Sequence, residues 1–298
     1  GIKALIEISG RDAKRLREVD LGFALAPRLN AAGRLDDMAL GIECLLCQDY
    51  QLAVEYSHQL DELNQERKQI ESEMKEQAME ALDRIMKQND HQKHLPVALA
   101  LYDKTWHQGV IGILAGRIKD RYHRPVIAFA MVDDGSELKG SARSVPGLNI
   151  RDVLAAIDKD QPGLIKKFGG HAMAAGLSLY PEALERFRDA FVHEVNQHLD
   201  IEQCEGVLLT DGPLDAQDFT LDTAMLIHQA GPWGQQFAEP IFDNTFEILD
   251  QRLVGQKHLK LTLTPEGHQK PIDAIMFNID TSAWPNHRAK AVHAACRL

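Results

Sequence analysis

The sequence predicts an α/β protein in which a long connecting helix precedes an α/β domain and an incomplete β-barrel follows it. Three observations carry this prediction. Residues 51–90 are polar, with apolar residues at helical spacing and no Gly or Pro before Asn89. Strand and helix patterns alternate across residues 96–200. After Ile201, short strand patterns separated by turns dominate, as in a small barrel.

The first 95 residues are expected to be mainly helical. Residues 1–20 predict a short helix followed by charged residues, and helical signals dominate from Met38 onward. Between them, residues 21–34 are punctuated by Pro27 and Gly33 and carry two arginines and an asparagine among small residues. A long amphipathic helix is a natural connector between domains, and we expect it to break between Asn89 and Pro96.

The middle segment predicts alternating strands and helices. Strands are expected at Val97–Tyr102, Pro125–Ala130, Leu138–Arg143 and Leu177–Leu179, and helices at Val110–Tyr122, Arg151–Ile157 and Glu182–Leu199.

The last segment predicts short strands and one helix. The strands are expected at Gly206–Leu209, Phe246–Val254, Leu259–Leu263, Ile272–Asn278 and Ala291–Leu298, and the helix at Asp222–Ala230. The last strand has no evident closing element, so we expect a barrel that is truncated at the C-terminus. Gly1 is not an initiator methionine, and we expect the chain to be part of a longer one.

Charge is unevenly distributed along the chain. The net charge is −11, which argues against a nucleic-acid partner. However, residues 101–180 carry 11 Lys/Arg and 8 Asp/Glu (+3), residues 181–250 carry 2 and 15 (−13), and residues 251–298 carry 7 and 3 (+4). Phosphate binding depends on the local field, so two basic blocks keep a nucleic-acid partner open. A solvated acidic helix surface explains part of the skew.

Composition excludes some other classes. No apolar run is long enough to span a membrane and no signal peptide is evident, so we expect a cytoplasmic protein with no membrane partner. Cys44 and Cys47 have CxxC spacing but lie in an apolar helical stretch without a second pair, which favours core packing over a zinc site. The sequence shows no P-loop, no nucleophile elbow and no Asp/His array for two metals.

The most informative motif is GGHAMAAG at residues 169–176. Gly169 and Gly170 can adopt dihedrals that other residues cannot, and a backbone with few side chains can lie against a ligand. Main-chain N–H groups and His171 could then hold a phosphate or a nucleic-acid backbone. A tight turn between core elements with a hydrogen-bonded histidine is the alternative.

Three further segments carry phosphate-binding residue types. His107 lies in WHQGVIG (106–112), at an expected strand-to-helix turn whose glycines and helix N-terminus favour anions. Ser141 and Arg143 alternate along a strand, so both are predicted on one face, where a hydroxyl and a guanidinium can share a phosphate. For each, a satisfied loop histidine or an edge-strand arginine remains an alternative.

Residues Arg28, Asn30 and Arg34 recur within one short window of small residues. Such a cluster can clamp a backbone phosphate or hold an interdomain turn by hydrogen bonds. Trp233 and Phe237, in the expected barrel, could stack bases, although two aromatics at a domain seam are more often core.

Together these segments resemble the RecJ family of bacterial single-strand-specific 5′→3′ exonucleases, in the DHH phosphoesterase superfamily. The matching pieces are APRLNAAGR (26–34), WHQGVIG (106–112), SARS (141–144) and GGHAMAAG (169–176), and their order along the chain also fits. The last motif is shared across the superfamily. The first, followed by an oligonucleotide-binding (OB) barrel, is more specific to the RecJ family.

The resemblance implies a domain organisation. Residues 1–50 would be the tail of the DHH domain and an interdomain segment, residues 51–95 the connecting helix, residues 96–200 the DHH-associated substrate-binding domain, and residues 201–298 a truncated OB-fold domain. The DHH domain, whose Asp-His-His signature binds Mn²⁺ or Mg²⁺, would precede Gly1. No catalytic or metal-binding residue is therefore carried over, and the chain alone is expected to be inactive.

The resemblance also implies a function in DNA recombination and repair. Two metals in the missing domain would activate water for attack on a phosphodiester. Ser141, Arg143, Gly169, Gly170 and His171 would hold the 5′-terminal phosphate and nearby backbone, and the OB barrel would bind the incoming single-stranded DNA. The remaining substrate-binding residues would be Arg28, Asn30, Arg34 and His107, with the two arginines lining a cleft between domains.

Partners and alternatives follow from the same resemblance. A monomer that works with a helicase and a single-strand-binding protein is expected. The alternatives are a DHH-family phosphodiesterase for short oligonucleotides or cyclic dinucleotides, and a non-catalytic single-strand-binding module. The PRLNAAGR segment and the trailing barrel argue against the phosphodiesterase.

Overall fold

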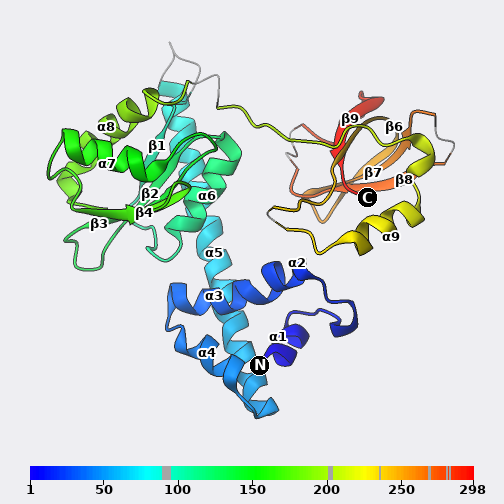
Figure 1. The fold of residues 1–298 in the computed structure, drawn as a ribbon, viewed down its shortest axis with the longest axis horizontal. Coiled ribbons are helices and arrows are strands. Elements are labelled where there is room, and N and C mark those ends of the chain that lie inside the picture. Colours follow the sequence, from blue (N-terminus) through cyan, green and yellow to red (C-terminus); the bar gives the residue numbers. More distant parts are fainter. Residues whose placement is uncertain (89–94, 201–203, 235, 268–269, 280, 282) are drawn as a thin grey trace. The chain divides into compact units, whose positions relative to one another are not determined.

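The structure is a computed structural model, and it describes residues 1–88, 95–200, 204–234, 236–267, 270–279, 281 and 283–298 (Figure 1). The chain divides into two compact units, Gly1–Gly206 and Val207–Leu298, and each is described by itself. Over the described residues, no helix is both long and apolar enough to cross a membrane. The expected break at 89–96 lies mostly outside the described part of the chain.

The first unit begins with helices packed around one long helix. The connecting helix is confirmed as α5 (Tyr50–Gln88), a single helix of 39 residues and about 58 Å. Its first half packs against α1 (Ile2–Ile8), α3 (Ala26–Leu35) and α4 (Ala39–Leu46). Their shared core contains Leu5, Leu25, Ala32, Cys44 and Leu60. Cys44 is fully buried, as the core-packing interpretation of the CxxC segment predicts.

The segment around Pro27 forms a helix. Pro27 lies in the first turn of α3, where its missing N–H costs no hydrogen bond. Short helical turns precede it, namely Ala13–Arg15, α2 (Glu18–Asp20) and a π-helical turn at Leu21–Leu25. The PRLNAAGR residues are therefore carried by one helix.

The α/β part of the first unit is a mixed sheet with helices on both faces. Its strands lie in the order β1 (Leu99–Tyr102), β2 (Val126–Met131), β3 (Leu138–Arg143), β5 (Ala174–Leu179) and β4 (Lys167–Gly170). Strands β1 and β2 are parallel, and the other neighbours are antiparallel. The remaining elements are the helices α6 (Ile111–Tyr122), α7 (Ile150–Asp160) and α8 (Leu184–Asn196), with a 3-10 turn at Pro181–Ala183.

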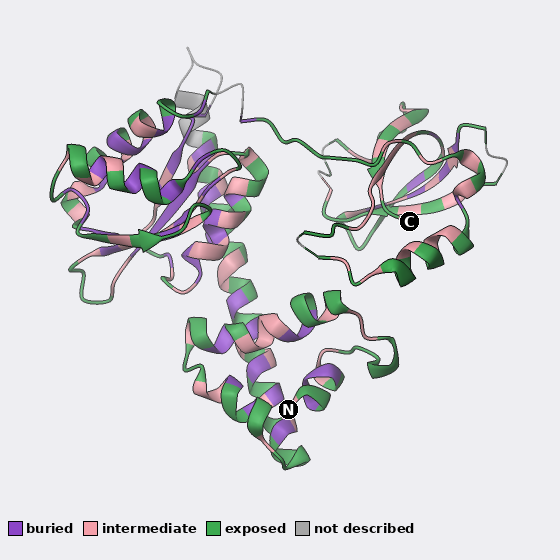
Figure 2. Ribbon diagram, viewed as in Figure 1, coloured by how far each residue is buried: buried purple, intermediate pink, exposed green. Residues whose placement is uncertain are grey.

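Alternation along β2 distributes the core between the two faces. Ile127 and Phe129 pack with α7 and α8, where Phe129 meets Phe187 edge to face at 5.6 Å. Val126 and Ala128 pack against α6 and the second half of α5. Figure 2 shows the buried strands between these helices. Beyond α6, the same face of β3, β5 and β4 remains partly exposed, which leaves a surface for a ligand.

The predicted strands and helices of this segment are confirmed, and two differences bear on the site. Strand β5 begins at Ala174, three residues before the predicted start. Strand β4 was not predicted, because Gly169 and Gly170 lower its strand propensity. The GGH segment is thus the end of an edge strand and the start of a hairpin, closed by a hydrogen bond from His171 N–H to Ala174 O (2.8 Å).

The second unit is an open antiparallel sheet. Its strands lie in the order β8 (Ile272–Met276), β7 (His258–Pro265), β6 (Phe242–Val254) and β9 (Ala291–Cys296). A 3-10 turn at Ala216–Asp218 and helix α9 (Leu221–Ala230) precede β6. The core contains Phe219, Phe246, Leu259, Leu261 and Leu263. The predicted strand at Gly206–Leu209 is wrong: the segment pairs with no strand, and Val207 is 82% and Leu209 83% exposed.

Gly170 is expected to be required for the hairpin between β4 and β5. Its φ is +146°, and an added Cβ would lie 2.5 Å from the carbonyl oxygen of Ala174. We expect Gly170→Ala to destabilise the protein by at least about 1–3 kcal/mol, because both the dihedral and the contact strain the backbone. Thermal unfolding followed by circular dichroism measures the change.

Gly169→Ala is the matched control, because an added Cβ there meets no atom within 4 Å. Its effect should stay within about 0.5 kcal/mol. Equal effects of the two substitutions would contradict this account of the hairpin.

Candidate nucleic-acid interface

Ser141 and Arg143 lie on one face of β3, as alternation predicts. The Arg143 guanidinium donates from Nη1 to Ser141 Oγ (3.0 Å) and to the carbonyl of Ala142 (2.8 Å). In the described part of the chain, no carboxylate forms an ion pair with Arg143. A half-buried cation without a counter-ion is suited to receive an anion.

The first turn of α6 lies directly against this pair. A Cβ on Gly112 would stand 2.9 Å from Arg143 Nη2 and 3.0 Å from Ser141 Oγ. Gly112 therefore lets the guanidinium pass beside the helix. Helix α6 has no side-chain cap at Val110, and Gly112 in its first turn places the positive end of the helix beside Arg143.

A second arginine approaches from α3. Arg34 donates from Nη1 to the carbonyl of Gly109 (3.3 Å) and is exposed. Burial first, and then the positive charge of Arg34, lowers the pKa of the Arg143 guanidinium from its ordinary value. Because arginine stays protonated at physiological pH, the two cations face each other at a cost that a bound anion would remove.

The loop before α6 is built to hold His107. The Gly109 N–H donates to Nδ1 of His107 (3.1 Å), which leaves Nε2 as the nitrogen that can carry the proton of the neutral ring. Trp106 Nε1 donates to Gln77 Oε1 on α5 (2.9 Å) and fixes the loop from behind. Gln77 was not among the predicted residues, because nothing in the sequence places it beside Trp106.

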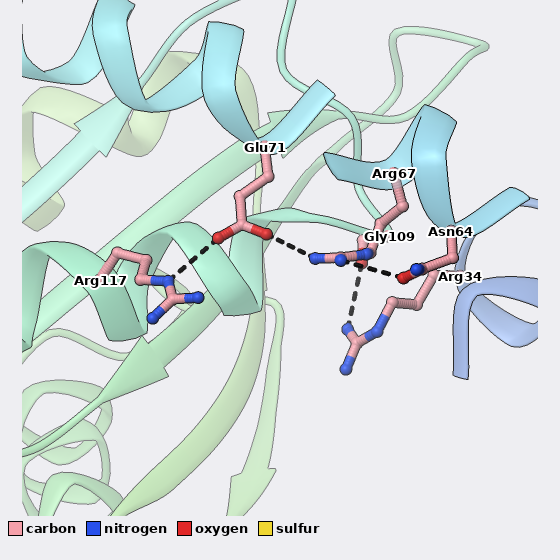
Figure 3. Close-up of polar contacts among 6 residues, drawn as sticks. All are labelled: Arg34, Asn64, Arg67, Glu71, Gly109 and Arg117. Carbon is pink, nitrogen blue, oxygen red and sulfur yellow. Dashed lines mark hydrogen bonds and ion pairs between the residues drawn. The ribbon is translucent and has the colours of Figure 1, made fainter. Parts of the chain in front are cut away.

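An ion network that is buried on the α5 side joins α5 to α6 (Figure 3). Arg67 contacts Glu71 (2.5 Å) and Asn64 Oδ1 (3.1 Å), and Arg117 on α6 contacts the other oxygen of Glu71 (3.0 Å). Asn64 is 1% and Arg67 9% exposed. One carboxylate thus serves two arginines and fixes α6 on the connecting helix. Sequence reasoning missed this network, since its members look like an ordinary charged helix face.

The glycine motif lies on the strands beside Arg143. Gly169 pairs with Gly176, which pairs with Ser141 on β3. His171 lies opposite Ala174, which pairs with Arg143, so the histidine backbone is two strands or about 10 Å from that arginine. Gly169, Gly170 and His171 are exposed. The sheet thereby places Gly169 in the row of Ser141, and His171 level with Arg143 at the same end of the strands.

The three predicted residues on α3 do not act together. At 3.6 residues per turn, Asn30 and Arg34 lie within about 40° of each other around the helix, whereas Arg28 lies on the far side. Arg28 pairs with Asp61 on α5 (2.8 Å) and donates to the carbonyl of Ala24 (2.6 Å). Its side chain is 13% exposed, so it holds α3 to α5. Asn30 is exposed one turn before Arg34.

The aromatic pair in the second unit is partly exposed. Trp233 and Phe237 stack with ring centroids 4.7 Å apart and planes at 28°. Trp233 Nε1 donates to the carbonyl of Ile227 at the end of α9 (3.1 Å), and Phe237 is 58% exposed. The free face of Phe237 can take a further ring.

The residues present do not fit a metal ion. Among the described residues, no group of three or more His, Cys, Asp or Glu side chains is placed to hold one. The groups that the described site offers are arginines, a histidine and backbone N–H groups, all of which can donate hydrogen bonds to an anion.

Two family models match the chain: a DHHA1 domain at residues 95–197 and a RecJ OB domain at residues 210–298. Curated relatives match along the whole chain. It is 51% identical to the single-stranded-DNA-specific exonuclease RecJ of Dickeya dadantii and 49% identical to that of Escherichia coli, in each case over 100% of this chain and 51% of the relative. The chain thus resembles RecJ proteins along its whole length. It spans about half the length of these RecJ relatives.

Solved RecJ structures share the fold. A RecJ from Thermus thermophilus in complex with Mg²⁺ superposes with a TM-score of 0.76 at 24% identity, over 99% of this chain and 42% of that chain. A manganese-bound exonuclease RecJ gives a TM-score of 0.53 at 28% identity, over 68% of this chain and 46% of that one. The arrangement of helices and sheets described above is therefore that of RecJ proteins.

Loss of Glu71 is expected to loosen α6 from α5. Glu71→Gln removes the carboxylate and leaves the buried charge of Arg67 without a counter-ion. We expect a loss of roughly 2–4 kcal/mol in the free energy of unfolding, measured by urea denaturation. Glu73→Gln is the control, since that exposed side chain accepts only from Gln69 on the same helix. A Glu71 variant as stable as the Glu73 variant would refute the structural role of the network.

Proposed function

We propose that this chain is the substrate-binding part of a single-stranded-DNA-specific exonuclease that acts 5′→3′ in recombination and repair. The observation that carries the proposal is the half-buried guanidinium of Arg143. It has no counter-ion among the described residues, it bonds Ser141, and it lies against Gly112 at the start of α6. This arrangement is supported as a DNA site by the RecJ relatives, which carry the name single-stranded-DNA-specific exonuclease.

The proposed ligand of this pair is the 5′-terminal phosphate. Arg143 can offer two N–H groups to one phosphate, and Ser141 can add a hydroxyl. Arg34 adds a second positive charge from α3, and His107 can donate from Nε2. A dianionic terminal phosphate gains more from two arginines than a monoanionic internal one does.

The rest of the proposed site follows the glycine motif. Gly169 and Gly170 leave the backbone of β4 open to the adjoining nucleotide, and His171 is exposed beside them. Asn30, which is exposed on α3, would contact the strand from that helix. Arg28 contributes through its ion pair with Asp61, which holds α3 in position.

The same proposal assigns the domains and the metal. Residues 1–50 would complete a DHH domain, residues 51–95 connect it, residues 96–200 bind the strand end, and residues 201–298 form the OB domain that binds the following strand. The divalent metal, Mn²⁺ or Mg²⁺, would be bound by the half of the RecJ length that this chain does not span. A cytoplasmic location, a monomeric state, and helicase and single-strand-binding protein partners stay predictions.

The first test is binding of the chain to single-stranded DNA with and without a 5′-phosphate, across a salt series with Mn²⁺ present. We expect phosphate-dependent, salt-sensitive binding and no products on a gel, because the described residues hold no metal cluster. Cleavage would mean that a metal site lies in this chain. Absence of binding at low salt would contradict the assignment of these residues as a self-sufficient substrate-binding part.

Arg143 is expected to set the preference for phosphorylated ends. In Arg143→Ala, affinity for a 5′-phosphorylated strand should fall by roughly tenfold, because a charge-assisted hydrogen bond contributes about 1.5–3 kcal/mol. Affinity for the unphosphorylated strand should change little. Arg151→Ala, which removes an exposed arginine from α7 on the opposite face, is the control. Equal affinities of wild type and Arg143→Ala for phosphorylated ends would contradict the assignment of Arg143 to the 5′-terminal phosphate.

A further inference from the structure

A shallow hollow lies on the open face of β3, β5 and β4, next to the Ser141/Arg143 pair. Its volume is about 290 Å³, and Lys139, Lys167, Gly169, Gly176 and Ser178 line it. The register explains this lining. Lys139, Ser178 and Lys167 form one row across the three strands, and Ser141, Gly176 and Gly169 form the next row.

The row that contains Gly176 and Gly169 forms an open floor between Arg143 at one end and the row of Lys139 and Lys167 at the other. A Cβ on Gly169 would meet no atom within 4 Å, and one on Gly176 would meet only the carbonyl oxygen of Gly140 at 3.9 Å. Nothing in the described part of the chain covers these glycines. A ligand can therefore lie directly on the backbone from the arginine end to the lysine end.

The lysine end has more cations than carboxylates. Lys139 pairs with Glu137 (2.5 Å) and donates to Ser178 Oγ (3.2 Å), and Lys166 pairs with the other oxygen of Glu137 (2.8 Å). The charge of Asp134 also acts on Lys166. Lys167 is exposed and forms no ion pair among the described residues. Lys167 is thus the uncompensated charge of this end, with Lys139 beside it in the same row.

The distance between the two ends fits a polynucleotide. Arg143 lies four residue steps from Lys139 on β3, which is about 13–14 Å along a strand. Each row of the sheet advances by about 7 Å. Successive phosphates of an extended single strand have a similar spacing, so a strand with one phosphate at Arg143 would present another at the lysine row.

We propose that Lys139 and Lys167 form a second phosphate subsite, which binds an internal phosphate of a strand whose terminal phosphate lies at Ser141 and Arg143. This subsite rests on the proposed function, and it adds the position along the bound strand at which a second phosphate is held. The intervening nucleotide lies over Gly169 and Gly176. A mononucleotide reaches only the arginine end, whereas a trinucleotide reaches both.

The test measures affinities of the full chain for 5′-phosphorylated thymidine mono-, di- and trinucleotides and a longer oligothymidylate, by competition with a labelled strand. In Lys139→Gln/Lys167→Gln, affinity for the trinucleotide and longer strands should fall by about threefold for each lost lysine–phosphate contact, which is the size expected of an exposed ion pair. The slope of log affinity against log salt should fall in magnitude by about 0.7 per lost contact. Affinity for the mononucleotide should not change.

The control is Lys159→Gln, which removes an exposed lysine from α7 on the opposite face of the sheet. Arg143→Ala separates this subsite from the proposed function. If Arg143→Ala is silent but the lysine variant weakens long strands, the terminal-phosphate assignment fails and the lysine contact stands. If the lysine variant binds long strands like Lys159→Gln, or weakens the mononucleotide equally, the second subsite is overturned while the first stands.

Discussion

The close approach of the α6 loop to the end of α3 is the constraint on which the candidate site depends. A Cβ on Gly109 would lie 2.0 Å from the carbonyl oxygen of Arg34, so only glycine allows this backbone contact. Gly112 allows the next one, between α6 and Arg143. Two glycines, three residues apart, therefore bring α3, the start of α6 and β3 together. Side chains at either position would separate the arginines that the site combines.

The same contact brings Arg34 and Arg143 together, and this proximity has an electrostatic cost that other interactions in the fold must offset. Arg34 and Arg143 repel each other, and burial disfavours the charge of Arg143. The compensating interactions lie behind the site. Glu71 joins Arg67 and Arg117 across α5 and α6, Asp61 holds Arg28, and Gln77 holds Trp106. The carboxylates on α5 thus pair with the structural arginines Arg28, Arg67 and Arg117, whereas Arg34 and Arg143 form no ion pair among the described residues.

The sequence could predict much of this fold, but only part of the site. Alternation along residues 138–143 was enough to place Ser141 and Arg143 on one face, because a strand has a period of two residues. The same alternation also includes Lys139. Arg28 could not be separated from Arg34 before α3 was known to be a helix, and its partner Asp61 lies 33 residues away on another helix. Strand β4 could not be predicted, because Gly169 and Gly170 give this segment a low strand propensity.

The negative net charge of the chain does not oppose a polyanion at this face. At physiological ionic strength exposed charges act over about 8 Å, so an acidic residue beyond that distance contributes little to the potential at Arg143. The cations at this face are Arg143, Lys139 and Lys167 on the sheet and Arg34 on α3, and Glu137 is engaged by Lys139 and Lys166 at one end. The local sign is therefore positive although the total is −11.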